Sequence, residues 1–224
     1  MDLNRVTQTD DLVKINTALI SVADKTGIVE FAEKLISVNP DITIYSTGGT
    51  YAALEKSLAA AARNLRQVAS YTGQPEMQGG LVKTLDFKIY LGLLSETYNE
   101  AHQADLQRLD ASVIDMVVVN LYPFKDTVAK GGISIEDART NIDIGGPCML
   151  RASAKNFLRV ASVCDPASYD EIAATLKQNG GALGIIQRLQ LAKKSFSHTA
   201  QYDTWISEYL NAQGADALSA YNLK

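Results

Sequence analysis

The sequence predicts an α/β fold with a mainly parallel central sheet and helices toward the C-terminus. Two adjacent segments, starting at Thr17 and Ile42, each combine a short apolar run, a polar loop and an apolar stripe at helical spacing. Such units in succession are typical of parallel strands joined by crossover helices. A further observation is the run I-D-M-V-V-V-N over 114–120, which has the continuous apolar character of a buried central strand.

The first unit follows a polar and aperiodic segment, residues 1–16, most of which we expect to form a tail before a single domain over 17–224. The run T-A-L-I-S-V over 17–22 predicts a buried parallel strand. A polar loop over 24–27 comes next. The apolar residues of 28–36 then recur at helical spacing, which predicts a helix.

The second unit continues this alternation. Residues 42–46 predict a strand, T-G-G-T over 47–50 predicts a glycine-rich turn, and a helix is expected to begin near Tyr51. The alanine-rich segment 57–65 is expected to prolong that helix, because alanine has the highest helix propensity. Residues 67–70 are a candidate third strand.

The later part of the chain alternates in the same way. Ser134 with Asp137 three residues later resembles a capping box, which predicts the start of a helix. We further predict a polar helix over 98–109, a last strand over 160–164, a helix over 168–179 and more helices from Ile185 onward.

The composition is that of an ordinary soluble globular protein, with 46% apolar and 21% charged residues among 224. No apolar run approaches the roughly 20 residues that span a bilayer, and the N-terminus lacks the apolar core of a signal peptide. We therefore expect a cytoplasmic protein that needs no membrane. The net charge of −4 disfavours nucleic acid as a partner. Cys148 and Cys164 form no C-x-x-C motif, so we expect free thiols and no structural zinc.

The predicted ligand site lies where the strands end, because open parallel sheets bind ligands at the carboxyl ends of their strands. The loops 24–27 and 47–50 both reach that edge, and their N–H groups suit a phosphate. The glycine-rich loop over 72–85 brings Lys83 to the same edge, with an ordinary surface loop as the alternative explanation. The edge also includes Tyr122 and the hydroxyls of Ser46, Thr47, Thr50 and Thr84.

The stretch N-I-D-I-G-G-P-C-M-L-R-A-S-A-K-N over 141–156 is the strongest local signal. Asp143 precedes a glycine pair, and a helix is expected to begin at Pro147, so that free N–H groups at its start favour an anion. Arg151 and Lys155 are four residues apart and share one helix face. Read alone, the stretch is equally compatible with a loop-to-helix corner followed by a solvated cationic face.

These charged residues favour proton transfer on a phosphorylated substrate. Lysines near one another or near an acid can have shifted pKa values and carry protons, and Lys25, Lys83 and Asp143 are candidates. His102 and His198 belong to no nucleophile motif, so Ser-His-Asp and Cys-His catalysis lack support. We expect neither a metal ion nor a redox cofactor.

A set of motifs carries a resemblance to a known family. S-V-A-D-K-T-G, S-T-G-G-T, T-G-Q-P-E-M, V-K-T-L, N-L-Y-P-F, N-I-D-I-G-G-P, A-K-N and F-S-H-T-A-Q-Y-D occur in this order. Over roughly residues 17–210 the chain resembles the IMP cyclohydrolase domain of the bifunctional AICAR transformylase/IMP cyclohydrolase family. The resemblance implies a methylglyoxal-synthase-like three-layer fold. It also implies the last step of de novo purine biosynthesis, in which FAICAR closes to IMP with loss of water.

The resemblance also implies the site. Lys155 resembles the family's proton donor and acceptor, and Lys83, Tyr122 and Asp143 complete the catalytic group. The positions that match nucleotide contacts, or adjoin them on the same loops, are Ala23, Asp24, Lys25, Thr26, Ser46, Thr47, Gly48, Gly49, Thr50, Val82, Thr84, Asn120, Leu121, Ile144, Gly145 and Gly146.

The third loop departs from the family pattern. Leu81 stands where an arginine usually helps to hold the nucleotide, and Asp86 replaces a histidine and brings negative charge toward an anionic ligand. Loss of a charge-assisted phosphate contact costs about 1.5–3 kcal/mol, or roughly ten- to a hundredfold in affinity. Lys88 or Arg151 is the hypothesised compensating cation.

These departures leave an alternative of another class, a non-catalytic purine-nucleotide-binding or regulatory domain of the same fold. Methylglyoxal synthase itself ranks lower, because it lacks the N-I-D-I-G-G and N-L-Y-P-F signatures. The family continues into an AICAR transformylase domain, and we expect its activity and folate binding to be absent from this chain, which ends at Lys224. A stand-alone protein and an excised domain both remain open. So do a homodimer, typical of the family, and a monomer.

Overall fold

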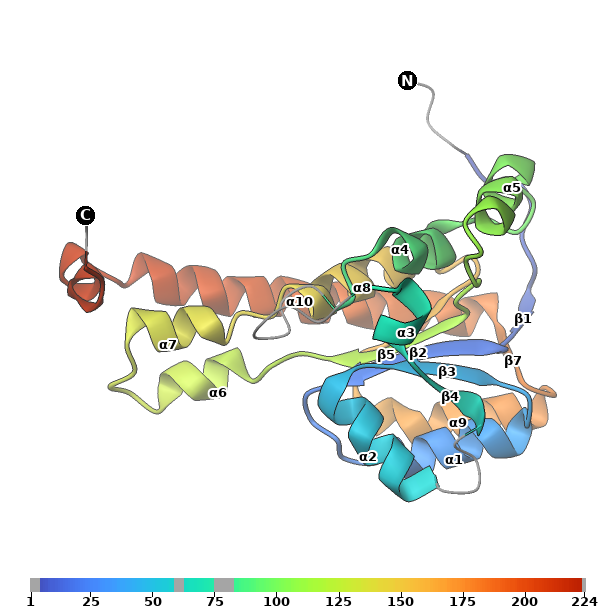
Figure 1. The fold of residues 1–224 in the computed structure, drawn as a ribbon, viewed down its shortest axis with the longest axis horizontal. Coiled ribbons are helices and arrows are strands. Elements are labelled where there is room, and N and C mark those ends of the chain that lie inside the picture. Colours follow the sequence, from blue (N-terminus) through green and yellow to red (C-terminus); the bar gives the residue numbers. More distant parts are fainter. Residues whose placement is uncertain (1–4, 59–62, 75–82, 223–224) are drawn as a thin grey trace.

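The computed structural model describes residues 5–58, 63–74 and 83–222. Its centre is a five-stranded sheet in the order β4-β3-β2-β5-β6, and every neighbouring pair of strands is parallel (Figure 1). These strands are β2 (Thr17–Val22), β3 (Thr43–Ser46), β4 (Leu65–Gln67), β5 (Met116–Asn120) and β6 (Ala161–Val163). The predicted α/β class with a mainly parallel sheet is confirmed.

The central strands alternate their side chains between two apolar cores. In β2, Ala18, Ile20 and Val22 face one core, while Leu19 faces the other. In β5 the two cores receive Met116 and Val118 on one side and Val117 and Val119 on the other. All these side chains are almost fully buried, and burying one aliphatic side chain stabilises the fold by about 1.5–3 kcal/mol. Because both faces are covered, these strands read as continuous apolar runs.

Helices cover both faces of the sheet and make three layers (Figure 1). The helices α1 (Ile28–Val38), α2 (Gly48–Leu58) and α9 (Tyr169–Gln178) lie on one side. The other side carries α3 (Val68–Thr72), α4 (Phe87–Leu94), α8 (Gly145–Lys155) and α10 (Ile185–Asn211). The remaining helix of the body, α5 (Glu100–Arg108), lies close to the N-terminal segment.

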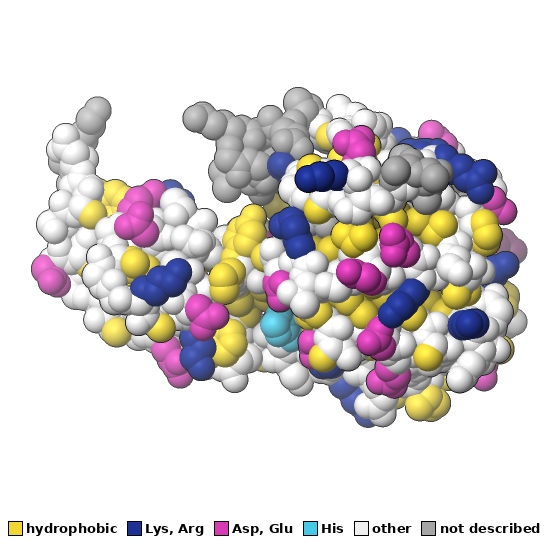
Figure 2. Space-filling view, turned by 90° about the horizontal axis from the view of Figure 1, so that it is seen from below, with side chains coloured by type: hydrophobic (Ala, Val, Ile, Leu, Met, Phe, Trp, Pro, Cys, Tyr) yellow, Lys and Arg dark blue, Asp and Glu magenta, His cyan; other side chains and the backbone are white. Residues whose placement is uncertain are grey.

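An arm extends past the carboxyl ends of the strands. It consists of α6 (Phe124–Ala129), α7 (Ile135–Thr140), the C-terminal half of α10 and the short helix η4 (Ala215–Ala220). Seen from below, the arm is a separate lobe, and acidic and basic side chains are interspersed on this face of the body (Figure 2). Among the described residues, no helix has the length and apolarity needed to cross a membrane.

The N-terminal segment is not a tail over its whole predicted length. Residues Leu12–Lys14 form β1, which pairs antiparallel with β7 (Ala182–Gly184), and Ile15 is buried. Arg188 at the start of α10 is fully buried and donates to five backbone carbonyl oxygens. Two of these acceptors belong to Asp10 and Asp11, so one guanidinium fixes the segment to the body.

Several predicted elements differ in extent. The strand predicted over 67–70 is wrong, because β4 ends at Gln67 and the next five residues form α3. The helix predicted to run through 57–65 is described only to Leu58, since 59–62 lie outside the described residues. The capping box at Ser134 is confirmed, with both of its hydrogen bonds to Asp137 present.

Candidate active site

A cavity of about 540 Å³ opens at the carboxyl edge of the sheet. Its walls come from the loops that follow β2, β3 and β5, from Lys83 and Thr84, and from the start of α8. It is lined by Ser21, Val22, Ala23, Lys25, Thr47, Gly48, Gly49, Thr50, Lys83, Thr84, Asn120, Tyr122, Pro123, Thr140, Ile142, Asp143, Ile144, Gly145, Gly146 and Met149. The two loops and the helix start that were predicted from separate parts of the sequence therefore meet in one cavity.

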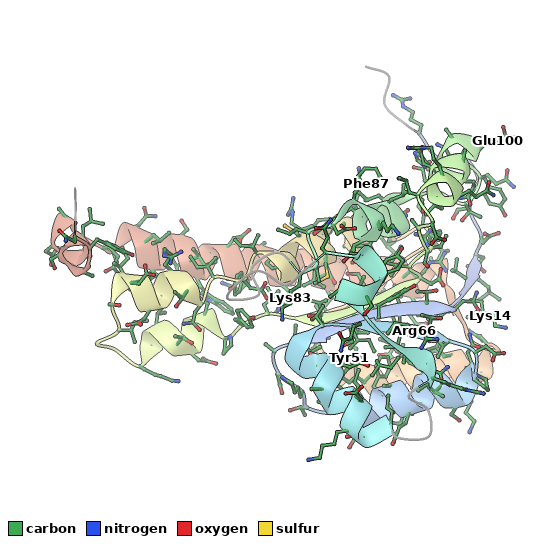
Figure 3. The ribbon with its side chains drawn as sticks, viewed as in Figure 1. Lys14, Tyr51, Arg66, Lys83, Phe87 and Glu100 are labelled. Atoms are coloured by element: carbon green, nitrogen blue, oxygen red, sulfur yellow. The ribbon has the colours of Figure 1, made fainter. Side chains whose placement is uncertain are left out.

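One end of the cavity is built to hold an anion. The helix α2 begins at Gly48, whose φ of 43° lies in the left-handed region that favours glycine. A Cβ at Gly48 would lie 3.1 Å from Lys83 Nζ, and one at Gly49 would lie 3.9 Å from Lys25 Nζ. Both ammonium groups therefore converge on the first turn of an 11-residue helix, whose free N–H groups also favour negative charge. Figure 3 shows Lys83 at this edge of the sheet.

Hydrogen bonds between the loops hold this end rigid. Asn120 Oδ1 accepts from Ala23 N at 2.6 Å and from Asp24 N at 2.9 Å, and its Nδ2 donates to Asp24 O at 2.7 Å. Thr50 Oγ1 accepts from Val22 N at 3.1 Å and donates to Val22 O at 3.0 Å. Both side chains line the cavity, yet their polar atoms already have partners. Asn120 and Thr50 thus shape the loops that would receive a ligand.

Four predicted contact residues do not line the cavity. Ser46 is fully buried and its hydroxyl donates to Ile20 O at 2.8 Å, which argues against its predicted ligand contact, and that contact stays a prediction. Leu121 packs inward against α8 and is 8% exposed. Asp24 Oδ1 accepts from the backbone N and the hydroxyl of Thr26, and these hydrogen bonds lower the pKa of Asp24. Both residues of that turn lie outside the cavity lining.

Asp143 lies at the other end, against the start of α8. Its Oδ1 accepts from Gly146 N at 2.9 Å, and a Cβ at Gly146 would lie only 2.6 Å from Oδ2. Burial raises the pKa of Asp143, while backbone hydrogen bonds from Gly146 and Tyr122 act in the opposite direction. A carboxylate with a raised pKa inside a cavity is suited to accept a proton from a substrate.

The start of α8 brings a hydroxyl beside the acid. The helix begins at Gly145, two residues before the predicted Pro147. A Cβ at Gly145 would lie 2.6 Å from Thr84 Oγ1, so the absence of a side chain is what lets Thr84 approach. The N-cap residue, Ile144, supplies no side-chain cap, and the carboxylate of Asp143 instead accepts from Gly146 N in the first turn.

Two large apolar side chains flank the mouth of the cavity. Tyr122 is 50% exposed and Ile144 is 54% exposed, although both line the cavity. A planar ring between them would bury apolar surface that is now open to water, and an aromatic side chain favours such stacking. The cavity therefore combines a cationic end, an apolar mouth and a carboxylate.

Two family models match parts of the chain. The model described as MGS-like domain matches residues 27–148, which is more than half of the chain. The chain belongs to the MGS-like domain family. A second model, described as AICARFT/IMPCHase bienzyme, matches residues 153–224.

Among curated proteins, this MGS-like chain is similar to the bifunctional purine biosynthesis protein PurH of Neisseria gonorrhoeae (strain NCCP11945). The identity is 49% over 205 residues, covering 92% of this chain and 38% of the relative. PurH of Ruminiclostridium cellulolyticum is 47% identical over 196 residues, covering 88% of this chain and 37% of the relative. The chain thus spans less than two fifths of the length of these relatives.

Among solved structures, the crystal structure of ForH aligns with a TM-score of 0.70 and 31% identity. The alignment covers 86% of this chain and 97% of ForH. The predicted methylglyoxal-synthase-like fold is therefore confirmed for this chain.

Lys155 is the one predicted catalytic residue that the structure keeps away from the cavity. It is exposed at the last residue of α8 and is not among the lining residues, whereas Gly145 at the other end of α8 is. Ten residues of helix separate the two, or about 15 Å along the axis. The spacing of Arg151 and Lys155 predicted that both lie on one face of α8. It did not predict which end of that helix meets the cavity.

The hypothesised compensating cations also lie elsewhere. Arg151 stacks over the ring of Phe196 at 5.7 Å, and Lys88 lies 5.5 Å from the ring centroid of Tyr71. Neither lines the cavity, which argues against the hypothesis that they replace the family arginine, and it stays a hypothesis. Asp86 caps α4 by accepting from Lys88 N at 2.8 Å, and its side chain does not line the cavity. Leu81 and Val82 lie outside the described residues.

Six lining residues were not predicted: Ser21, Val22, Pro123, Thr140, Ile142 and Met149. The hydroxyl of Ser21 lies 2.8 Å from that of Thr47 and joins the ends of β2 and β3. The sequence did contain a signal for Ser21, because this residue is the polar interruption of an apolar strand that ends at this edge. Thr140 and Ile142 belong to the arm and could not be assigned to the cavity before the arm was placed.

Proposed function

We propose that this chain is an IMP cyclohydrolase, which closes FAICAR to IMP with loss of water. The observation that carries the proposal is the polarity of the cavity. Lys25 lies against the first turn of α2 at one end, and the partly buried Asp143 lies at the other. Lys83 lies between them, because it reaches the same turn of α2 while the next residue, Thr84, reaches the start of α8. A phosphoribosyl substrate has the matching polarity, with its phosphate at one end and its reacting base at the other. The similarity to PurH proteins supports this choice of substrate.

In the proposed binding mode the phosphate lies against the start of α2. Lys25, the hydroxyl of Thr47 and the N–H groups of the Gly48–Gly49 turn would supply charge and donors. The imidazole ring would lie at the mouth beside Tyr122 and Ile144. This orientation directs the carboxamide and formamido groups toward Asp143 and the start of α8.

The chemistry needs a base and a stabilised oxygen. The carboxamide nitrogen attacks the formyl carbon, a C–N bond forms, and Asp143 accepts the proton that this nitrogen loses. The formyl oxygen gains negative charge, which Lys83 and the hydroxyl of Thr84 at the start of α8 would stabilise. The formamido nitrogen loses a second proton, the C–O bond breaks, and the oxygen leaves as water with both protons. Lys83 would donate to the leaving oxygen, and the raised pKa of Asp143 suits this carboxylate to its role as the base.

The family resemblance gives Lys155 the proton-carrying role, and the distance along α8 argues against it in this cavity. Our proposal therefore assigns protonation of the leaving oxygen to the ammonium group of Lys83. The hydroxyl of Tyr122, which also lines the cavity, is a second candidate donor. The variant Lys155→Ala separates the two assignments. Turnover within threefold of wild type supports Lys83, whereas a loss of a hundredfold or more would return the role to Lys155.

The test of the function is the rate of IMP formation from FAICAR by the purified chain, corrected for the spontaneous reaction. We expect turnover in the wild type, a loss of about a hundredfold or more in Asp143→Asn, and a comparable loss in Lys83→Ala. Lys88→Ala is the matched control, because this lysine lies outside the cavity lining. A wild type no faster than background would refute the proposal.

The second candidate is a non-catalytic purine-nucleotide-binding domain. Its support is the small number of cations, since Lys25 and Lys83 are the only Lys or Arg among the described lining residues, and Leu81 replaces the family arginine. Calorimetry with IMP distinguishes the two candidates. Binding of IMP without conversion of FAICAR would favour the binding domain.

A further inference from the structure

Tyr202 on α10 contacts the loop that carries Asp143, although α10 does not line the cavity. Its hydroxyl accepts from Asp143 N at 2.8 Å and donates to Asn141 O at 3.3 Å. These two partners use the donor and the acceptor capacity of the hydroxyl on one short segment of backbone. The side chain is 1% exposed, so water does not compete for these bonds.

The ring of Tyr202 also contacts the loop that carries Tyr122. It packs edge to face on Phe124, with ring centroids 6.3 Å apart and an interplanar angle of 69°. Phe124 is 1% exposed and begins α6, two residues after Tyr122. One buried side chain is therefore in contact with both segments from which the candidate catalytic groups Tyr122 and Asp143 project.

We propose that Tyr202 is a positioning residue, whose hydroxyl holds the backbone of Asp143 so that its carboxylate stays directed at the substrate. The inference rests on the proposed function for its catalytic part. The hydroxyl is a neutral partner at working pH, because burial raises the pKa of Tyr202 to about 12. Its action on Asp143 is thus geometric, through the backbone N–H, and needs no proton transfer from the phenol.

Removal of the hydroxyl leaves a partly buried N–H and a partly buried carbonyl without this partner. Such groups move to find water or another partner, and a displacement of about 1 Å at a catalytic group lowers the rate by roughly a hundredfold. The phosphate end of the cavity is formed by other loops, so binding of the nucleotide should be retained. The expected signature is a fall in kcat with little change in KM.

The experiment compares Tyr202→Phe with Tyr209→Phe in the FAICAR assay. Tyr209 is the matched control, because it lies on the same helix and also packs edge to face on Phe124, at 5.8 Å. No hydrogen bond of its hydroxyl is described, so its removal spares the loop of Asp143. We expect kcat to fall ten- to a hundredfold in Tyr202→Phe, with KM within threefold, and both to stay within twofold in Tyr209→Phe.

A double-mutant cycle separates positioning of Asp143 from general support of the fold. If Tyr202 acts through Asp143, adding Tyr202→Phe to Asp143→Asn should lower the residual rate by less than twofold. An independent, multiplied loss in the double variant would overturn the proposal. So would an unchanged kcat in Tyr202→Phe while the wild type turns over.

A second measurement does not depend on turnover. Amide hydrogen exchange at Asp143 should accelerate about tenfold or more in Tyr202→Phe and stay unchanged in Tyr209→Phe. An unchanged exchange rate would overturn the claim that the hydroxyl holds this backbone. If the wild type shows no turnover, the proposed function and the catalytic part of this inference fail together, and the exchange rate still decides the structural part.

Discussion

The contact between Gly146 and Asp143 makes the sharpest prediction. In Gly146→Ala the new Cβ would lie 2.6 Å from Asp143 Oδ2 and 2.6 Å from Leu121 Cδ2. These distances are about 0.8 Å short of the 3.4 Å at which ordinary contact begins. The carboxylate is the group free to yield, because Leu121 is packed in the core and α8 is anchored along its length. The variant should therefore push Asp143 away from Gly146 N.

Two opposing effects set the cost in stability. Overpacking costs about 1–3 kcal/mol, while alanine in place of a helical glycine returns up to about 1 kcal/mol. The net loss of about 0–3 kcal/mol corresponds to a fall in Tm of at most about 12 °C for a chain of this size. Activity should respond far more strongly, since a displacement near 1 Å at a catalytic group costs roughly a hundredfold.

The assay is kcat for FAICAR cyclisation beside a thermal melt. Gly184→Ala is the control, because the nearest heavy atom to its Cβ would be 3.8 Å away and the residue lies at β7, outside the cavity lining. We expect the control to keep wild-type kcat. A kcat within twofold of wild type in Gly146→Ala would refute the argument that this close approach sets the position of the acid.

Three further variants test other parts of the structure. The folded-state pKa of Asp143 is raised above its ordinary 3.8, so the charged carboxylate lowers the free energy of unfolding at pH values above that folded pKa. Below pH 3.8 the carboxyl is protonated in both states, and this cost is absent. Asp143→Asn should therefore match or exceed the wild-type Tm at pH 7, and this advantage should vanish as the pH falls toward 4; a lower Tm at pH 7 would contradict it. Arg188→Met leaves five carbonyls without their donor and should cost about 3 kcal/mol or more in urea unfolding, with early proteolysis of the N-terminal segment; an unchanged midpoint would contradict it. Ser46→Ala should cost about 1 kcal/mol with an unchanged KM, in contrast to a raised KM in Thr47→Val, and a raised KM in both would return Ser46 to the ligand site.

The sequence predicted the elements whose pattern is local. β2 was predicted residue for residue, because a polar loop bounds its apolar run. The helix α4 was missed, because F-K-I-Y-L-G-L-L has eight residues and one charged side chain, Lys88, which is too little to define a polar face, although Asp86 is an N-cap signal. The strand β1 has three residues and exists only through its pairing with β7, which lies about 170 residues later. No local pattern could have predicted it.

The candidate site also has a part that the sequence predicted and a part that it did not. The groups at the carboxyl ends of strands were predicted together, because parallel topology alone places Lys25, Thr47 and Tyr122 at one edge. Lys155 shows the limit of the reasoning, since periodicity assigns a residue to a helix face without saying which end of the helix meets a cavity. Tyr202 lies in the quoted motif F-S-H-T-A-Q-Y-D, yet no role could be assigned to it from the sequence. Its role depends on two hydrogen bonds to backbone about 60 residues earlier in the chain.

Three separate features hold the carboxylate of Asp143 in a partly buried position, although burial disfavours its charged form. Gly146 donates its N–H to the carboxylate, the missing Cβ of the same residue leaves room for it, and Tyr202 fixes the backbone behind it. Because all three act on one carboxylate, their losses should not multiply. The double variant Gly146→Ala with Tyr202→Phe should be within about threefold of the slower single variant in kcat. Rates that fall by the product of the single losses would mean that the two residues serve different parts of the reaction, and the shared role of Asp143 would have to be abandoned.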